Sequence, residues 1–148
     1  MYGKDKDKIW RREEIYEKLV SAYYSENPEI DLTYIPNAKL IGCISNEKRQ
    51  IDLLIDAWWG DDLSRRIIVD AKLYNKKLDI KDVEEFEGMM KDCKAEHGIL
   101  VCPMGYSGGA FKRAQDTITI RLLTFEELNE QSVWANYSKC IGKCQNSK

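Results

Sequence analysis

The sequence predicts one α/β domain in which a mixed central β-sheet is flanked by helices. Its 148 residues fit a single domain, since domains usually contain about 100–200 residues. Hydrophobic residues make up 43% of the chain and charged residues 32%, as expected of a globular protein and not of a disordered segment. Helical and strand-like patterns follow one another in the order α-β-β-β-α-β-α-β, with no internal repeat or linker. This order favours a sheet covered by helices on both faces.

The first helix is predicted over residues 9–24, where apolar residues recur at helical spacing. Pro28 and the polar residues before it end the pattern. Two short extended pieces, residues 32–35 and 39–44, are expected next, on either side of Pro36. This part of the chain therefore predicts a helix followed by two short strand segments.

An antiparallel hairpin is predicted from residues 50–58 and 66–72, which are both rich in strand-forming residues. The segment between them contains Gly60, Asp61 and Asp62, which favour a turn. The simplest pairing therefore centres the hairpin near Asp61.

The second half of the sequence predicts a longer helix over residues 79–96, because its apolar residues step by three or four positions. Gly98 is expected to cap the end of this helix. The remaining elements are short: a strand at 99–102, a helix at 107–115, a strand at 117–123 and a helical turn at 125–129. We expect residues 1–130 to form the domain and residues 131–148 to be a partly flexible C-terminal extension.

The sequence contains no stretch that approaches the roughly 20 apolar residues needed to cross a bilayer. Residues 1–12 alternate lysine and aspartate and lack the apolar core of a secretory signal. The five cysteines are an odd number without C-x-x-C spacing, which favours reduced thiols. We therefore expect a cytoplasmic protein that has no membrane partner.

Two carboxylates lie inside otherwise apolar strands, Asp52 in residues 51–55 and Asp70 in residues 67–71. An unpaired buried carboxylate is unfavourable, so each of them needs a partner. A hairpin centred near Asp61 pairs Asp52 with Asp70, on the face that also carries Lys72. A slip of one residue would separate the two acids.

Two close carboxylates repel each other, and a divalent cation that prefers oxygen ligands relieves the repulsion. Mg²⁺ is the expected cofactor, with Mn²⁺ as a substitute. Lys72 beside such a metal would orient or help to deprotonate a water and neutralise developing charge, which suits phosphodiester hydrolysis. A buried ion pair of Lys72 with Asp70 or Asp52, without any chemistry, accounts for the same residues.

The string Asp-x-Lys is by itself unspecific, since it begins at Asp70, Asp79 and Asp92. Only Asp70 follows a β-branched apolar run and has an embedded acid, Asp52, one strand upstream. Context therefore selects Asp70 and Lys72.

The net charge of −2 excludes nucleic-acid binding by global attraction, so any basic contacts must be local. Basic residues cluster in the thirteen residues 65–77, which contain one acid, Asp70. The candidate phosphate contacts in this stretch are Arg65, Arg66, Lys76 and Lys77. A solvated strand end and loop is the alternative explanation. Ser107, before a predicted helix, would cap it or help to hold a phosphate. The phosphate-binding pattern G-x-x-x-x-G-K-[ST] is absent, so no nucleotide cofactor is expected.

Several motifs are spread over residues 10–125: Arg49-Gln50-Ile51-Asp52, Ile68-Val69-Asp70-Ala71-Lys72, Val83-x-x-Phe86-x-Gly88, Gly98-Ile99-Leu100-Val101 and Gly105-Tyr106-Ser107-x-x-Ala110. In this order and spacing they resemble the restriction-endonuclease-like (PD-(D/E)xK) nucleases, particularly their Mrr-like branch. The resemblance implies a restriction-endonuclease-like fold in which an acid on the second core strand and the acid and lysine of the third bind Mg²⁺ and activate water.

By position, the resemblance assigns these catalytic roles to Asp52, Asp70 and Lys72, and the predicted metal ligands are Asp52, Asp70 and Ala71. Many members add a glutamate from the first helix. Tyr16-Glu17-x-x-Val20 resembles the pattern found there, so Glu17 is the candidate fourth catalytic residue. Glu13 and Glu14 are the alternatives to Glu17, and a solvent-facing glutamate without a role remains open.

The sequence thus predicts a Mg²⁺-dependent endonuclease that hydrolyses DNA phosphodiester bonds. A homodimer is a further expectation, because cutting both strands of a duplex needs two sites or two successive events. Two alternatives remain open. One is a non-catalytic module with a nuclease fold that binds nucleic acid or a protein partner, and the other is a nuclease for branched DNA or RNA.

Overall fold

The computed structural model of the chain describes residues 11–26, 31–59, 62–73, 75–117 and 119–128. The predicted C-terminal extension, residues 131–148, lies outside them. The elements in chain order are α2 (Arg12–Glu26), β1 (Asp31–Ile41), β2 (Lys48–Trp59), β3 (Asp62–Ala71), α3 (Ile80–Asp92), β4 (His97–Val101), α4 (Gly108–Asp116), β5 (Ile120–Leu123) and α5 (Phe125–Leu128). The predicted order of helices and strands is confirmed. No described helix has the length and apolar character that a membrane crossing requires.

The strands form one five-stranded sheet in the order β1-β2-β3-β4-β5. β1, β2 and β3 are antiparallel neighbours, whereas β3, β4 and β5 run parallel. The parallel pairs require crossover connections, which α3 and α4 provide. The sheet is therefore mixed, as predicted.

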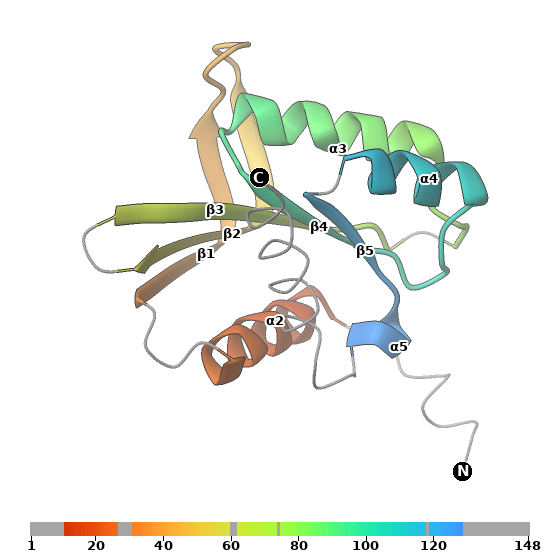
Figure 1. Ribbon diagram of the computed structural model, residues 1–148, viewed down its shortest axis with the longest axis horizontal. Helices are drawn as coiled ribbons and strands as arrows, with labels where there is room; N and C mark the ends of the chain where they lie inside the picture. Colours follow the sequence, from red (N-terminus) through yellow and green to blue (C-terminus); the bar gives the residue numbers. More distant parts are fainter. Residues whose placement is uncertain (1–10, 27–30, 60–61, 74, 118, 129–148) are drawn as a thin grey trace, which may run out of the picture.

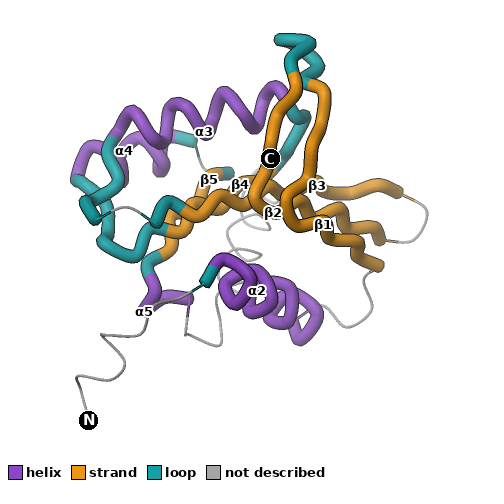
Figure 2. The backbone as a smooth tube through the Cα atoms, turned by 180° about the vertical axis from the view of Figure 1, so that it is seen from behind, coloured by secondary structure: helices purple, strands orange, loops and turns teal. Residues whose placement is uncertain are grey.

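Helices cover both faces of this sheet, with α2 on one side and α3 and α4 on the other (Figures 1 and 2). Alternate side chains of β3 point to opposite faces, as expected of a strand. Val69 lies in the core cluster that contains Ile15 of α2, whereas Ile68 lies in the cluster that contains Phe86 of α3. The apolar run of β3 is thus buried on both faces.

The helix α3 ends earlier than the sequence predicts. It stops at Asp92, and Lys94 follows in the left-handed region with φ 56°. The expectation that Gly98 caps this helix is wrong, because Gly98 lies within β4. A Cβ at Gly98 would come within 2.4 Å of the Phe86 ring, so close packing of helix on strand requires glycine there.

The hairpin of β1 and β2 bends at Asn37 of β1 and Asp52 of β2. Pro36 pairs with Leu53 and Ala38 with Ile51, so Asn37 and Asp52 lie between these pairs. Asn37 has a left-handed φ of 53°, and side-chain alternation fails in β2, where Ile51 and Leu54 both face the α3 side. The two extended pieces predicted around Pro36 are therefore one bent strand. Beyond the bend, the hairpin rises toward the end of α3 (Figure 1).

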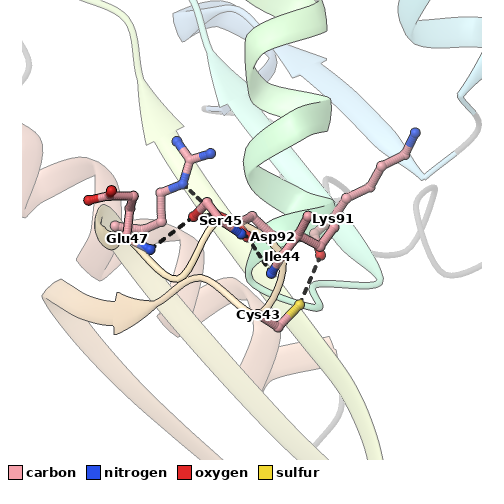
Figure 3. Close-up of polar contacts among 7 residues, drawn as sticks. Cys43, Ile44, Ser45, Glu47, Lys91 and Asp92 are labelled. Atoms are coloured by element: carbon pink, nitrogen blue, oxygen red, sulfur yellow. Dashed lines mark hydrogen bonds and ion pairs between the residues drawn. The ribbon is translucent and has the colours of Figure 1, made fainter.

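Asp92, the last residue of α3, binds the tip of this hairpin through hydrogen bonds (Figure 3). Its carboxylate, in a residue that is 3% exposed, accepts hydrogen bonds from the backbone N–H groups of Ile44 and Ser45, both at 2.9 Å. The Ser45 hydroxyl donates to it at 2.6 Å, and Arg49 Nε at 2.7 Å. These bonds, first those of Ser45 and Arg49, hold the pKa of Asp92 well below its usual range. The hairpin tip and α3 are thus joined by a fully hydrogen-bonded charge.

Candidate active site

Asp52 and Asp70 lie side by side on neighbouring strands. Leu53 pairs with Val69 in the antiparallel ladder of β2 and β3. One residue further along the ladder, the same register places Asp52 opposite Asp70. This is the register that a turn near Asp61 predicts. Asp52 Oδ2 accepts a hydrogen bond of 2.9 Å from the backbone N–H of Ala71. At the bend in β2, the Asp52 carboxylate thus lies against the last residue of β3.

The two carboxylates have opposite pKa shifts. Burial, together with the hydrogen bond and charge of Asp52, raises the pKa of Asp70 to about 6, although Lys72 acts in the opposite direction. Burial alone would also raise the pKa of Asp52, but hydrogen bonds from Asp70 and the Ala71 N–H outweigh it, and that pKa is lowered. A proton on this pair therefore resides on Asp70 rather than on Asp52.

Lys72 directly follows β3 and reaches back to the pair. Its Nζ lies 2.8 Å from Asp70 Oδ2, and its backbone N–H donates to the Val101 carbonyl at 2.8 Å, which holds the residue against β4. The side chains of Lys72 and Asp70 are 22% and 19% exposed, so water and small ions can reach them. The three residues predicted from the sequence thus converge at one accessible place.

Two further side chains reach this place from α2. Arg12 Nη1 donates to the Ala71 carbonyl at 3.0 Å and lies 3.8 Å from Asp52 Oδ2. Tyr16 follows Arg12 by four residues, so the two share a helix face. The Tyr16 hydroxyl is buried near Asp52, and first burial and then that charge raise its pKa. It has no hydrogen bond of standard geometry in the described part of the chain.

Arg12 and Tyr16 are not among the site residues predicted from the sequence. Two features of the sequence could have indicated them: the two residues are four apart and so share a helix face, and Tyr16 directly precedes the predicted Glu17. Glu17 and Glu13 are exposed and Glu14 is half-buried. In the described part of the chain, Asp52 is contacted by Arg12 and the Ala71 backbone N–H and Asp70 by Lys72, whereas no such contact with Glu17 is present. Glu17 as a fourth catalytic residue stays a prediction.

The basic residues predicted to contact phosphate differ in their surroundings. Arg66 is held within the protein, since its Nε lies 3.0 Å from Asp56 Oδ1 and its Nη1 donates to the Cys93 carbonyl at 3.0 Å. Arg65 is half-buried, and its charge acts on Tyr23 and His97. Lys76 and Lys77 are exposed on the connection from β3 to α3.

Ser107 is the N-cap of α4, and its Oγ accepts the backbone N–H of Ala110 at 3.1 Å. The capping role considered for this residue is therefore present. A phosphate contact by Ser107 stays a prediction.

The donor set at the carboxylate pair fits a hard divalent cation. It offers the carboxylates of Asp52 and Asp70 and the carbonyl of Ala71, whereas no group of three or more His, Cys, Asp or Glu suited to a metal occurs in the described segments. Mg²⁺ needs only one or two protein carboxylates and takes water and phosphate as its other ligands. Burial first, and then the hydrogen bond and charge of Asp52, raise the pKa of Asp70, and a bound cation would favour its charged form.

The titration of Asp70 leads to a testable pH dependence of stability in the metal-free protein. Its folded-state pKa of about 6 lies above the ordinary value of 3.8, so the folded protein binds this proton more tightly than the unfolded chain does. The stabilisation is complete below pH 3.8 and is lost as the pH rises through 6. We expect the loss to be about 2 kcal/mol, after allowance for partial exposure.

Urea unfolding in EDTA between pH 4 and 8 measures this effect. Asp70→Asn removes the titrating group, so wild type should lose stability relative to this variant as the pH rises. A difference between the two proteins that stays constant across the range would contradict the assigned shift.

Comparison with known proteins yields a family and a fold. A family model described as restriction endonuclease, Mrr_cat, matches residues 42–131. The structure is similar to the crystal structure of a protein of unknown function, AF1548, with a TM-score of 0.53 and 16% identity over 77% of this chain and 64% of that one. This likeness supports the fold.

A second solved structure in the comparison is the DNA modification-dependent restriction endonuclease AspBHI, with a TM-score of 0.41 and 14% identity over 96% of this chain and 41% of that one. The chain thus spans less than two thirds of the length of either structure. No curated protein sequence matched it.

Proposed function

Because the chain belongs to the restriction endonuclease family, whose model matches residues 42–131, we propose that it is a Mg²⁺-dependent endonuclease acting on DNA. The observation that carries the proposal is the convergence of Asp52, Asp70 and Lys72. The Asp52 and Asp70 carboxylates are adjacent, and Lys72 Nζ is 2.8 Å from Asp70. Two carboxylates with an ammonium group at an accessible place by the end of the central strand β3 suit the hydrolysis of a phosphodiester.

In this proposal Asp52, Asp70 and the Ala71 carbonyl hold the metal. When bound, Mg²⁺ would polarise the phosphoryl group and lower the pKa of a bound water. Asp52 is kept charged and oriented by the Ala71 N–H at 2.9 Å. Lys72 is aimed by its contact with Asp70 and by the tie of its backbone to β4, so its ammonium group can donate to water or to a phosphate oxygen.

Substrate binding in the proposal uses the exposed Lys76 and Lys77, with Arg65 as a further candidate. Phosphate contacts of this kind weaken as salt rises. Arg66 already has an ion pair within the protein, which makes it the weaker candidate. A homodimer would supply the two centres that cutting both strands of a duplex requires.

Plasmid nicking tests the proposed activity. We expect the full chain to nick supercoiled DNA in Mg²⁺, to stop in EDTA, and to lose activity with Asp70→Ala because the metal site loses a carboxylate. Asp116→Ala is the matched control, since that side chain is 84% exposed on α4. Equal nicking by wild type and Asp70→Ala would refute the proposal. DNA binding without cleavage by any variant would favour the non-catalytic module.

A further inference from the structure

Arg12 touches the oxygens that the proposed metal would need. Its Nη1 donates to the Ala71 carbonyl at 3.0 Å and lies 3.8 Å from Asp52 Oδ2. These two groups, with Asp70, are the donor set described above. The guanidinium of Arg12 thus supplies positive charge where a divalent cation would supply it.

A guanidinium and a metal ion that share these oxygens at short range repel each other. The guanidinium is always charged and only donates hydrogen bonds, so it repels a cation and offers it no ligand. A cation bound to the Ala71 carbonyl would lie close to the Arg12 guanidinium, and the repulsion between the two favours withdrawal of Arg12. Withdrawal is easy, because the Arg12 side chain is 45% exposed and begins at the first residue of α2.

We propose that Arg12 is an internal counter-ion that occupies the metal site in the metal-free protein and turns out to solvent when a divalent cation binds. The inference rests on the proposed function, since it concerns the same metal site. Arg12 therefore sets the metal affinity of the protein: the cation must displace a charge that already neutralises Asp52. In the metal-free protein Arg12 thus compensates the charge of Asp52, while Lys72 pairs with Asp70.

Metal binding distinguishes this role from a role of Arg12 in holding phosphate. The probe is Mn²⁺ alone, titrated into the full chain without DNA at pH 8, where Asp70 is ionised, and followed by calorimetry and by the spin resonance of free Mn²⁺. We expect Arg12→Gln to bind Mn²⁺ about tenfold more tightly than wild type, because one close positive charge is removed. Arg12→Lys keeps the charge and should stay near wild type.

Arg11→Gln is the matched control, because Arg11 is exposed and removing it changes the net charge equally one residue away. Its Mn²⁺ affinity should change by no more than about twofold, since exposed charges are screened. Arg12→Gln binding Mn²⁺ no better than Arg11→Gln would overturn the counter-ion role while leaving the metal site intact. If Asp70→Asn binds Mn²⁺ as well as wild type, or if no variant binds it, the metal site itself fails and the counter-ion role fails with it.

Discussion

Replacing Lys72 with methionine should slow Mg²⁺-dependent plasmid nicking by about 10²–10⁴-fold while leaving the protein folded. Methionine retains an unbranched apolar side chain but removes the ammonium group that lies 2.8 Å from Asp70 Oδ2. That group is the cation closest to Asp70 among the ion pairs of the described residues. In the proposed mechanism its loss removes both the orientation of water and the stabilisation of charge on the phosphate.

Single-turnover nicking and thermal unfolding should be measured together for this variant. Lys77→Met is the matched control, because Lys77 is exposed and lies five residues further along the connection to α3. We expect its rate to fall only a few-fold and the difference to shrink at high salt. If Lys72 were only a structural partner of Asp70, Lys72→Met would lower the melting temperature and nick DNA at the wild-type rate. That outcome would remove Lys72 from the mechanism.

The second large effect is expected at Asp92, away from the candidate active site. Asp92→Asn should lower the melting temperature by roughly 10 °C, because the buried carboxylate accepts four hydrogen bonds from Ile44, Ser45 and Arg49. An amide has one acceptor oxygen, and its NH₂ group would face N–H and O–H donors. The Arg49 guanidinium would also lose its charged partner.

Calorimetric melting of Asp92→Asn and Asp116→Asn checks this expectation. Asp116 is a helix-end aspartate of α4 whose side chain is 84% exposed, so its variant should melt within about 2 °C of wild type. Ser45→Ala should give an intermediate loss, since it removes only the hydroxyl contact. An Asp92→Asn protein as stable as the Asp116 control would show that the hairpin tip does not depend on this charge.

The sequence allowed the centre of the candidate site to be predicted because one register decides it. A turn near Asp61 brings Asp52 opposite Asp70, and the structure has this register at Leu53 and Val69. The same register pairs Asp56 with Arg66. The predicted hairpin register therefore already implied the ion pair of Arg66 with Asp56, although Arg66 was predicted to contact phosphate.

Other features depend on how distant elements dock, which local patterns do not reveal. Periodicity identifies the apolar face of the first helix, but it does not tell which edge of that face meets Asp52, so Arg12 and Tyr16 were missed. Asp92 was passed over as one of three Asp-x-Lys strings. An acid at the C-terminus of a helix is unfavourable for the helix dipole, and only donors some 45 residues away along the chain explain it.

The bend in the hairpin also affects how the molecule meets its own copies. β1 is one of the two edge strands of the described sheet, and Tyr34 and Ile35 on it are 49% and 52% exposed. A straight apolar edge of this length would be a template for the addition of foreign strands and hence for aggregation. Pro36 offers no N–H to an incoming chain, and the left-handed Asn37 turns the backbone away at the next residue. The bend that positions Asp52 therefore also makes the exposed edge strand β1 a poor template for the addition of further strands.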